Sequence, residues 1–114
     1  MPGMRPVLFG GYAPRIRSQG IWAFPLPEGI NLKAAGPLFC GGITVFNPII
    51  QKNIRPTDRV AVVGIGGLGH IAIKILNAWG CDVTAISSNA EKENDARMFG
   101  ASHFLHSREP NDLK

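Results

Sequence analysis

Three glycines in a GxGxxG spacing are the residues of this chain best suited to bind a ligand. Gly64, Gly66 and Gly69 directly follow an apolar run and precede a stretch of helical periodicity. In that setting the first glycine permits a tight turn, the second lets a phosphate approach the backbone, and the third lets the helix pack closely on the strand. The N–H groups and the dipole at the helix start favour a negative charge. The spacing predicts a pyrophosphate site at Gly64, Ile65, Gly66, Gly67, Leu68 and Gly69.

Strands and helices alternate around this turn. Residues 59–63 are a β-branched apolar run, long enough for a buried strand and too short for a helix. Residues 82–86 form a second apolar run, and residues 103–106 are expected to form a third strand. Because helical stretches separate these strands, the pattern predicts an α/β fold with a parallel sheet and right-handed crossovers.

The two helices between the strands carry their own start and stop signals. Gly80 is placed to end the first helix in the left-handed conformation. Ser88 or Asn89 is expected to cap the second helix, which runs through Met98 and ends at Gly100. The apolar face expected for the first helix consists of Ile71, Ala72, Ile75, Leu76 and Trp79.

The front of the chain differs in composition, since eight of the nine prolines lie between Pro2 and Pro56. Residues 12–16 and 21–24 are short candidate strands. Pro14 would confine the first of them to a sheet edge, because proline has no N–H to give to a ladder. The front part is therefore expected to be built from strands and turns.

Two helices are expected between this front part and the first strand of the sheet. One begins near Leu32 and is expected to be broken by Gly36 and Pro37. The next is expected over residues 40–51, with Pro48 kinking it or lying near a break.

The segment after the second strand of the sheet decides which dinucleotide such a fold takes. An acidic residue there hydrogen-bonds the ribose 2′-hydroxyl of NAD and repels the 2′-phosphate of NADP. Ser87 lies about where this acid is expected, and Lys92 follows about one helical turn later. Small polar groups and a lysine favour NADP over NAD, whereas a solvated Lys92 beside a simple helix cap is the alternative. The expected 2′-phosphate contacts are Ser87, Ser88, Asn89 and Lys92.

Other interpretations of the glycine turn stay open. A strand-to-helix turn of this kind also occurs without a ligand, and some methyltransferases bind an adenosyl cofactor at a glycine-rich first turn. The net charge of +4 raises the question of nucleic acid, but the Lys and Arg residues are scattered along the sequence. We therefore expect no nucleic-acid partner.

Length and composition limit the classes of protein to which this chain can belong. A chain of 114 residues with 45% apolar residues suits one modest domain or part of a larger one. It has no apolar run of membrane-spanning length and no secretory signal at its start, so we expect a cytoplasmic protein without a membrane partner. Cys40 and Cys81 form neither a CxxC pair nor a disulfide framework.

Two segments resemble a known family. PLFCGGITV at residues 37–45 and VVGIGGLGH at residues 62–70 are similar to the zinc-type medium-chain alcohol dehydrogenases, in particular their cinnamyl-alcohol-dehydrogenase-like branch. The similarity extends over nearly the whole chain. It implies a Rossmann-type, doubly wound sheet, of which this chain holds only a part, preceded by the tail of a mainly-β catalytic domain.

The resemblance also implies roles for individual residues. Cys40 matches the last cysteine among the catalytic zinc ligands, and Thr44 matches a threonine that contacts the cofactor near the nicotinamide. The family's pyrophosphate and 2′-phosphate sites fall on the two segments already described.

The same resemblance implies that parts are missing. The family's other zinc ligands and its four-cysteine structural zinc site lie upstream, so we expect zinc in the full-length family but not on this chain alone. The chain is expected to be an internal fragment. Residues 1–36 would be the tail of the catalytic domain, residues 37–56 a linking helix segment, and residues 57–114 the first half of the dinucleotide-binding domain.

By resemblance, the parent protein is an NADP(H)-dependent zinc alcohol dehydrogenase or aldehyde reductase. It would transfer a hydride between the nicotinamide and a primary alcohol or aldehyde. We expect the fragment alone to be inactive. The alternative is a non-catalytic NADP-binding module or truncated pseudoenzyme, and a homo-oligomer is left open.

Overall fold

A computed structural model describes residues 12–108 of the chain. The chain divides into two compact units, Met1–Ile30 and Asn31–Lys114. No helix within residues 12–108 has the length and apolar character that a membrane crossing requires.

The described part of the first unit contains one short 3-10 helix, η1 (Gly20–Trp22). The predicted strands at residues 12–16 and 21–24 are wrong. Instead, the amide of Trp22 donates to the carbonyl of Gln19 at 3.0 Å, which closes a local turn. An apolar extended segment becomes a strand only where a neighbouring strand pairs with it. The strands among residues 12–108 pair with one another, and none pairs with this segment.

The second unit begins with a run of helix. Helix α1 (Leu32–Pro37) passes into the π-helical turn η2 (Leu38–Gly42), which passes into α2 (Ile43–Gln51). The side chain of Asn31 caps the start by accepting from the amide of Lys33 at 3.0 Å.

The break predicted at Gly36 and Pro37 coincides with the end of α1, but the chain continues in helical conformation through η2. Pro37 has φ −59°, a value that the helix itself requires, so its ring fits the helical backbone. The wider π-helical turn begins directly after this proline. Pro48 likewise lies inside α2, which runs on to Gln51.

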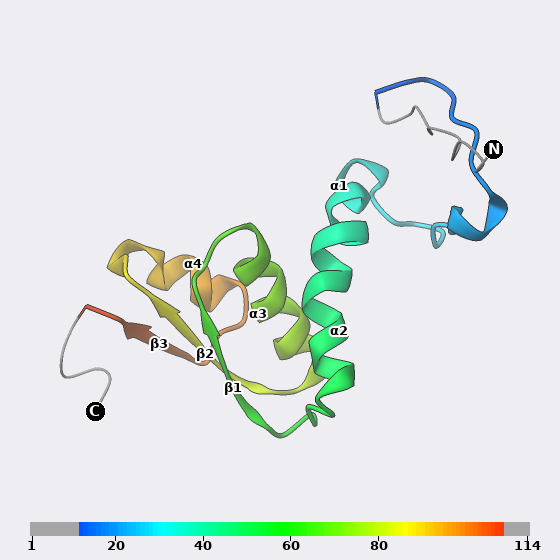
Figure 1. Ribbon diagram of the computed structural model, residues 1–114. Helices are drawn as coiled ribbons and strands as arrows, with labels where there is room; N and C mark the ends of the chain where they lie inside the picture. The colour runs from blue at the N-terminus through cyan, green and yellow to red at the C-terminus, as the bar shows by residue number, and fades with distance from the viewer. Residues whose placement is uncertain (1–11, 109–114) are drawn as a thin grey trace, which may run out of the picture. The chain divides into compact units, whose positions relative to one another are not determined.

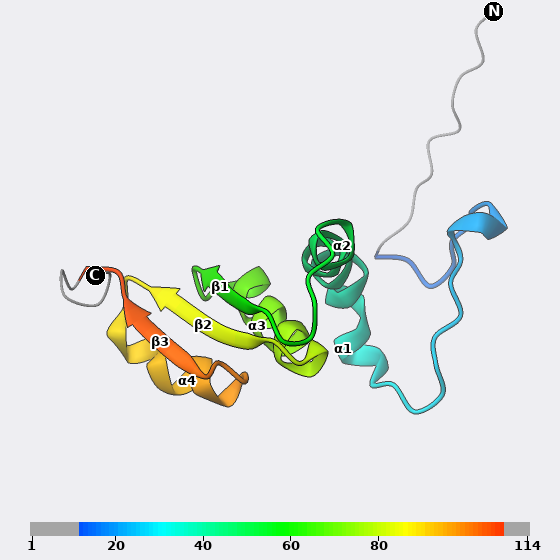
Figure 2. The same cartoon turned by 90° about the horizontal axis from the view of Figure 1, so that it is seen from below.

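The parallel sheet is confirmed. Its strands are β1 (Arg59–Val63), β2 (Asp82–Ser87) and β3 (His103–His106), in the order β1-β2-β3. Val63 of β1 stands opposite Ile86 of β2. Figures 1 and 2 show β2 between the other two strands, with all three arrows running in the same direction. Because the pairing is parallel, all carboxyl ends of the strands meet at one edge of the sheet.

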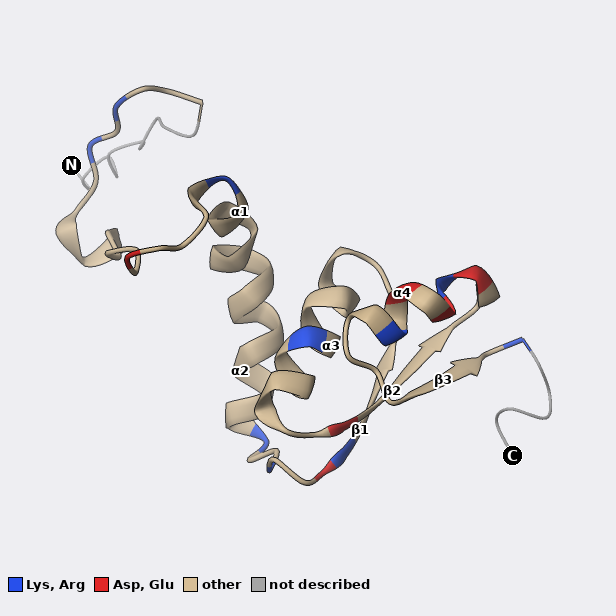
Figure 3. Cartoon of the chain, turned by 180° about the vertical axis from the view of Figure 1, so that it is seen from behind, with Lys and Arg blue, Asp and Glu red and all other residues tan. Residues whose placement is uncertain are grey.

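The crossovers are α3 (Gly67–Trp79) and the pair η3 (Ala90–Lys92) and α4 (Glu93–Met98). Seen from behind in Figure 3, α3 and α4 both lie in front of the strands, so they cover the same face of the sheet. Within the described chain, no helix covers the opposite face. The first strand was expected to be buried, but Val63 is 79% exposed and β1 is shielded on one side only. Parallel sheets are usually covered on both faces.

The core lies between the sheet and the covering helices. Ile73 of α3 and Val83 and Ala85 of β2 are fully buried, and Ala96 of α4 packs with them. Leu76 belongs to this core as predicted, but Ile73, the most buried residue of α3, lies outside the face expected from the spacing. The reason is that α3 packs against both the sheet and α2, so more than one of its faces is covered. The ring of Phe46 meets Trp79 edge-on at 5.8 Å between α2 and α3.

The ends of the helices follow the predicted signals. Gly80 and Gly100 have φ of 105° and 106°, the left-handed conformation expected after α3 and α4. Asn89, rather than Ser88, caps η3 by accepting from the amide of Glu91 at 3.0 Å. Figure 3 shows acidic and basic residues next to one another along η3 and α4.

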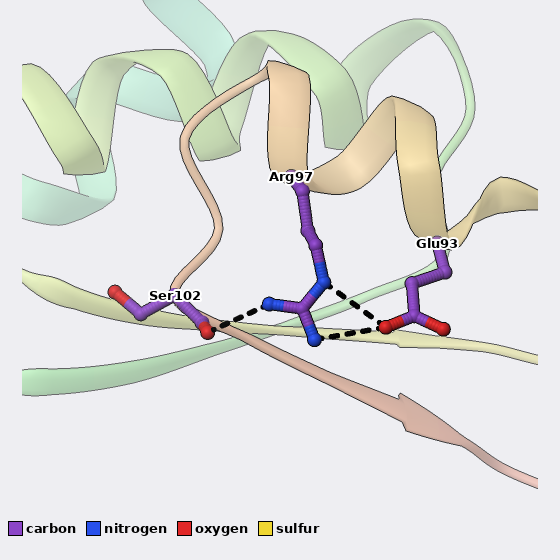
Figure 4. A network of polar contacts seen from close by, with 3 residues as sticks. All are labelled: Glu93, Arg97 and Ser102. Carbon is purple, nitrogen blue, oxygen red and sulfur yellow. Dashed lines mark hydrogen bonds and ion pairs between the residues drawn. The ribbon is translucent and has the colours of Figure 1, made fainter.

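One arginine ties α4 to the loop before β3. The guanidinium of Arg97 donates to Oε1 of Glu93 at 2.8 and 3.0 Å and to the carbonyl of Ser102 at 3.2 Å (Figure 4). This contact fixes the chain between α4 and β3 and so supports the position of the third strand.

Cys81 is a buried thiol at the turn from α3 to β2. Its side chain is 6% exposed, and Sγ donates to the carbonyl of Arg55 at 3.4 Å. Burial, together with the nearby charge of Asp58, raises the pKa of Cys81 above the ordinary value of 9.0. Cys81 is therefore a structural thiol and is held in its protonated form.

Candidate functional site

The carboxyl edge of the sheet brings the two predicted ligand-binding segments together. The glycine turn follows β1, and the segment that begins at Ser87 ends β2. In Figure 1 both turns lie at the same end of the sheet. Ligands of open parallel α/β sheets bind in the crevice outside the carboxyl ends of the strands.

The glycine turn has the backbone geometry that its sequence predicts. Gly64 has φ +89°, in the left-handed region that side chains rarely adopt. A Cβ on Gly69 would overlap the carbonyl oxygen of Gly64, so the start of α3 and the turn are in direct backbone contact. A Cβ on Gly66 or Gly67 would meet no atom within 4 Å. The space in front of these two glycines is therefore open to a ligand.

The hydrogen bonds of the turn hold both of its ends. The amide of Gly64 donates to the carbonyl of Ile86 on the neighbouring strand at 2.9 Å. The amide of His70 donates to the carbonyl of Gly66 at 3.1 Å, and Nδ1 of His70 lies 3.0 Å from the same oxygen. His70 is thus a residue of the helix start.

A cavity of about 330 Å³ lies between the glycine turn and the end of β2. Seven of the eleven residues predicted to bind the cofactor line it: Gly64, Ile65, Gly66, Ser87, Ser88, Asn89 and Lys92. Val63 and Ile86 add apolar walls, and Ser107 lies at its rim. Among residues 12–108, Lys92 is the only charged side chain in the lining, and no carboxylate of that range lines the cavity. A phosphate inside it would face this lysine and small polar groups.

Polar contacts fix the wall that the end of β2 provides. The hydroxyl of Ser87, a residue that is only 7% exposed, accepts from the amide of Asn89 at 3.1 Å. Nε2 of His106 donates to the carbonyl of Ser88 at 3.0 Å. Across the cavity, Nζ of Lys92 donates to the carbonyl of Ile65 at 2.6 Å. The two predicted segments are thus joined by a direct hydrogen bond.

A larger and more open cavity of about 850 Å³ lies on the other side of the glycine turn. Cys40 and Gly41 of η2 line it together with the first residues of α3, Gly67, Leu68 and Gly69. A Cβ on Gly41 would stand 3.1 Å from Cδ1 of Ile71, so the π-helical turn packs closely on α3. The lining is largely apolar, and Cys40 is an exposed free thiol.

The structure does not bring the remaining two predicted residues into one site. Thr44 is exposed on α2 and lines neither cavity. Cys40 has no partners for a metal, because residues 12–108 contain no group of three or more His, Cys, Asp or Glu side chains that could hold an ion. A catalytic zinc needs three protein ligands. The described residues therefore do not fit a zinc site.

Sequence reasoning missed the part that the third strand plays. Ser107 follows β3, and its amide donates to the carbonyl of Ser87 at 2.9 Å. It carries no motif, and only the parallel register of β2 and β3 brings it to the rim of the smaller cavity. The sequence pattern places Val63 and Ile86 in strands, and it carries no signal that they line a ligand site.

Comparisons with known proteins agree with this geometry. Residues 67–114 match the profile of the zinc-binding dehydrogenase family. The chain is 52% identical over 102 residues to the aldehyde reductase AdhA of Synechocystis sp., an alignment that covers 90% of this chain and 30% of that protein. The chain thus spans about a third of the length of the relatives that it matches.

Two solved structures share the fold. A cinnamyl alcohol dehydrogenase from Sorghum bicolor is 42% identical with a TM-score of 0.74, over 76% of this chain and 25% of that one. A cinnamyl alcohol dehydrogenase from Helicobacter pylori, solved in complex with NADP(H), is 35% identical with a TM-score of 0.65, over 68% of this chain and 22% of that one. With its glycine turn, its parallel sheet and these similarities, the chain belongs to the zinc-binding medium-chain dehydrogenase family.

Proposed function

We propose that this chain binds the adenosine and phosphate part of NADP(H), within a protein that reduces aldehydes or oxidises primary alcohols. The observation that carries the proposal is the smaller cavity, in which the glycine turn faces Ser87, Ser88, Asn89 and Lys92. The pyrophosphate would lie against the open backbone at Gly66 and Gly67, at the start of α3.

The choice of NADP over NAD rests on the charge of this cavity. An NAD site would place a carboxylate at the end of β2. Here Ser87 ends the strand, and Lys92 supplies the one charge that the described part of the chain places in the lining. A lysine ammonium attracts a phosphate strongly in a partly enclosed site. The Helicobacter pylori relative solved with NADP(H) supports the same choice.

The catalytic part of the proposal concerns the longer protein. The nicotinamide, when bound, exchanges a hydride with the substrate carbon. In that protein Thr44 would contact the cofactor near the nicotinamide, and Cys40 would supply one ligand to a zinc completed by residues outside this chain. The aldehyde reductase from Synechocystis sp. supports an aldehyde or alcohol as substrate.

We also keep the proposed division of the chain. Residues 1–36 would belong to a catalytic domain, residues 37–56 would link it to the nucleotide fold, and residues 57–114 would form the first half of that fold. The second candidate function is an NADP-binding module without catalysis. It would apply if no further zinc ligands join Cys40 in the longer protein.

A titration of the purified chain with NADPH and NADH tests the proposal, with cofactor fluorescence and thermal unfolding as readouts. We expect saturable binding of NADPH that is about tenfold tighter than that of NADH, since a charge-assisted hydrogen bond contributes about 1.5–3 kcal/mol. Equal affinities for NADPH and NADH would contradict the proposed 2′-phosphate site. If the chain is folded and binds neither nucleotide, the proposed function is wrong.

A further inference from the structure

Lys92 makes a contact that its proposed role at a phosphate does not require. Its ammonium crosses the smaller cavity and donates to the carbonyl of Ile65, 27 residues away in sequence, at 2.6 Å. Ile65 is the second residue of the glycine turn, and its side chain is buried. Lys92 itself is half-buried and forms no ion pair with another described residue.

The middle of the glycine turn has few other supports. Its amide at Gly64 is bonded to Ile86 on β2, and the carbonyl of Gly66 is bonded to His70 within α3. These bonds hold the two ends of the turn. Between these two ends lies the carbonyl of Ile65, and among the described residues Lys92 supplies the hydrogen bond to it. Glycines gain more conformational freedom than other residues when such a turn opens, so this bond falls where the backbone is least restrained.

We infer that Lys92 is a positioning residue, which holds the glycine turn in its nucleotide-binding geometry before a cofactor arrives. An ammonium has three N–H donors, so one remains on Ile65 while the others are free for a phosphate. Fixing a binding loop in its bound conformation lowers the entropy cost of binding. Lys92 therefore raises the affinity for every dinucleotide, and not only for one with a 2′-phosphate.

The inference rests on the proposed function only for its consequence for binding. The effect on the turn itself belongs to the cofactor-free chain. It is measured by amide hydrogen exchange in the 114-residue chain without nucleotide, comparing the parent with Lys92→Met. Lys52→Met is the matched control, because Lys52 is an exposed lysine that lines neither cavity.

In Lys92→Met we expect the amides of Gly64 and His70 to exchange about fivefold faster, as the loss of one hydrogen bond allows. The amides of β2 should keep their parental rates, which separates local opening of the turn from a general loss of stability. Parental rates at Gly64 and His70 in Lys92→Met would overturn the inference. So would complete exchange of both amides in the parent, because the turn would then not be held at all.

Binding supplies the second readout. If Lys92 contacts only the 2′-phosphate, its replacement leaves the affinity for NADH unchanged. If Lys92 also holds the turn, the affinity of Lys92→Met for NADH is expected to be about threefold lower than that of the parent, and its affinity for NADPH lower still. Unchanged NADH affinity would overturn the inference while leaving the proposed function intact. Failure of the parent to bind either nucleotide would overturn the proposed function, with the exchange result still deciding the role of Lys92.

Discussion

Gly69 and Gly64 touch through their backbones, because a Cβ on Gly69 would overlap the carbonyl oxygen of Gly64 and stand 3.0 Å from its carbonyl carbon. The first turn of α3 therefore lies directly against the end of β1. Both groups are backbone atoms, so neither can move aside as a flexible side chain would. This contact fixes the direction in which the helix start points toward the cavity.

Replacing Gly69 by alanine is expected to force the turn and the helix apart. We expect Gly69→Ala to lower the free energy of unfolding by about 3 kcal/mol, as overpacking against a rigid neighbour does. Urea denaturation measures the change. Gly67→Ala is the control, because a Cβ there meets nothing within 4 Å, and its stability should match the parent or exceed it slightly. Equal stability of the two variants would contradict this account of the turn.

Gly66→Ala separates binding from stability. Gly66 has φ −112°, which any residue adopts, and a Cβ there would project into open space. We expect the unfolding free energy to stay within about 0.5 kcal/mol of the parent. The dissociation constant for NADPH should rise at least about tenfold, because the methyl group occupies the place of the pyrophosphate. Parental NADPH affinity would show that the phosphates bind elsewhere.

The end of β2 is the position at which cofactor choice can be reversed. In Ser87→Asp a carboxylate would face the cavity, where it repels a 2′-phosphate and accepts hydrogen bonds from the ribose hydroxyls of NAD. We expect the NADPH/NADH affinity ratio to fall by about a hundredfold. Ser87→Ala, which adds no charge, should change the ratio much less. If both variants shift the ratio equally, charge at this position does not set the preference.

The buried thiol predicts an alkaline loss of stability. Because folding raises the pKa of Cys81, the folded chain keeps this thiol protonated at pH values where the unfolded chain has released the proton. The stabilising contribution is therefore complete below the ordinary pKa of 9.0 and is lost as pH rises beyond it, toward the pKa of the folded state. Urea midpoints of the parent should fall more steeply above that pH than those of Cys81→Ala. If the urea midpoints of the two proteins fall equally with pH, the raised pKa of Cys81 is contradicted.

The sequence predicts the back of the molecule well because its signals there are local. The β-branched run at residues 59–63 and the glycines at 80 and 100 mark element ends that the structure reproduces. Ile73 was missed because the periodicity of a single helix does not show which neighbours will pack on it. Residues 12–16 and 21–24 were wrongly assigned as strands, since an extended segment needs a partner that local sequence does not show.

The sequence predicts the two segments of the candidate site, but not the contacts that join them. The glycine turn and the segment from Ser87 to Lys92 are recognisable motifs. The hydrogen bond from Lys92 to Ile65 and the place of Ser107 depend on strand order and register, which join residues far apart in sequence. Such contacts follow from the assembled sheet, so they become visible only in the structure.

The order of the strands also decides how the wall at Ser87 is held. Within the described chain, β2 has neighbours on both sides, whereas β1 and β3 have one each. The end of β2 accepts a hydrogen bond from each neighbour, because the amide of Gly64 donates to the carbonyl of Ile86 and the amide of Ser107 donates to the carbonyl of Ser87, both at 2.9 Å. The part of the cavity proposed to choose between dinucleotides is therefore the part that the sheet anchors from two sides.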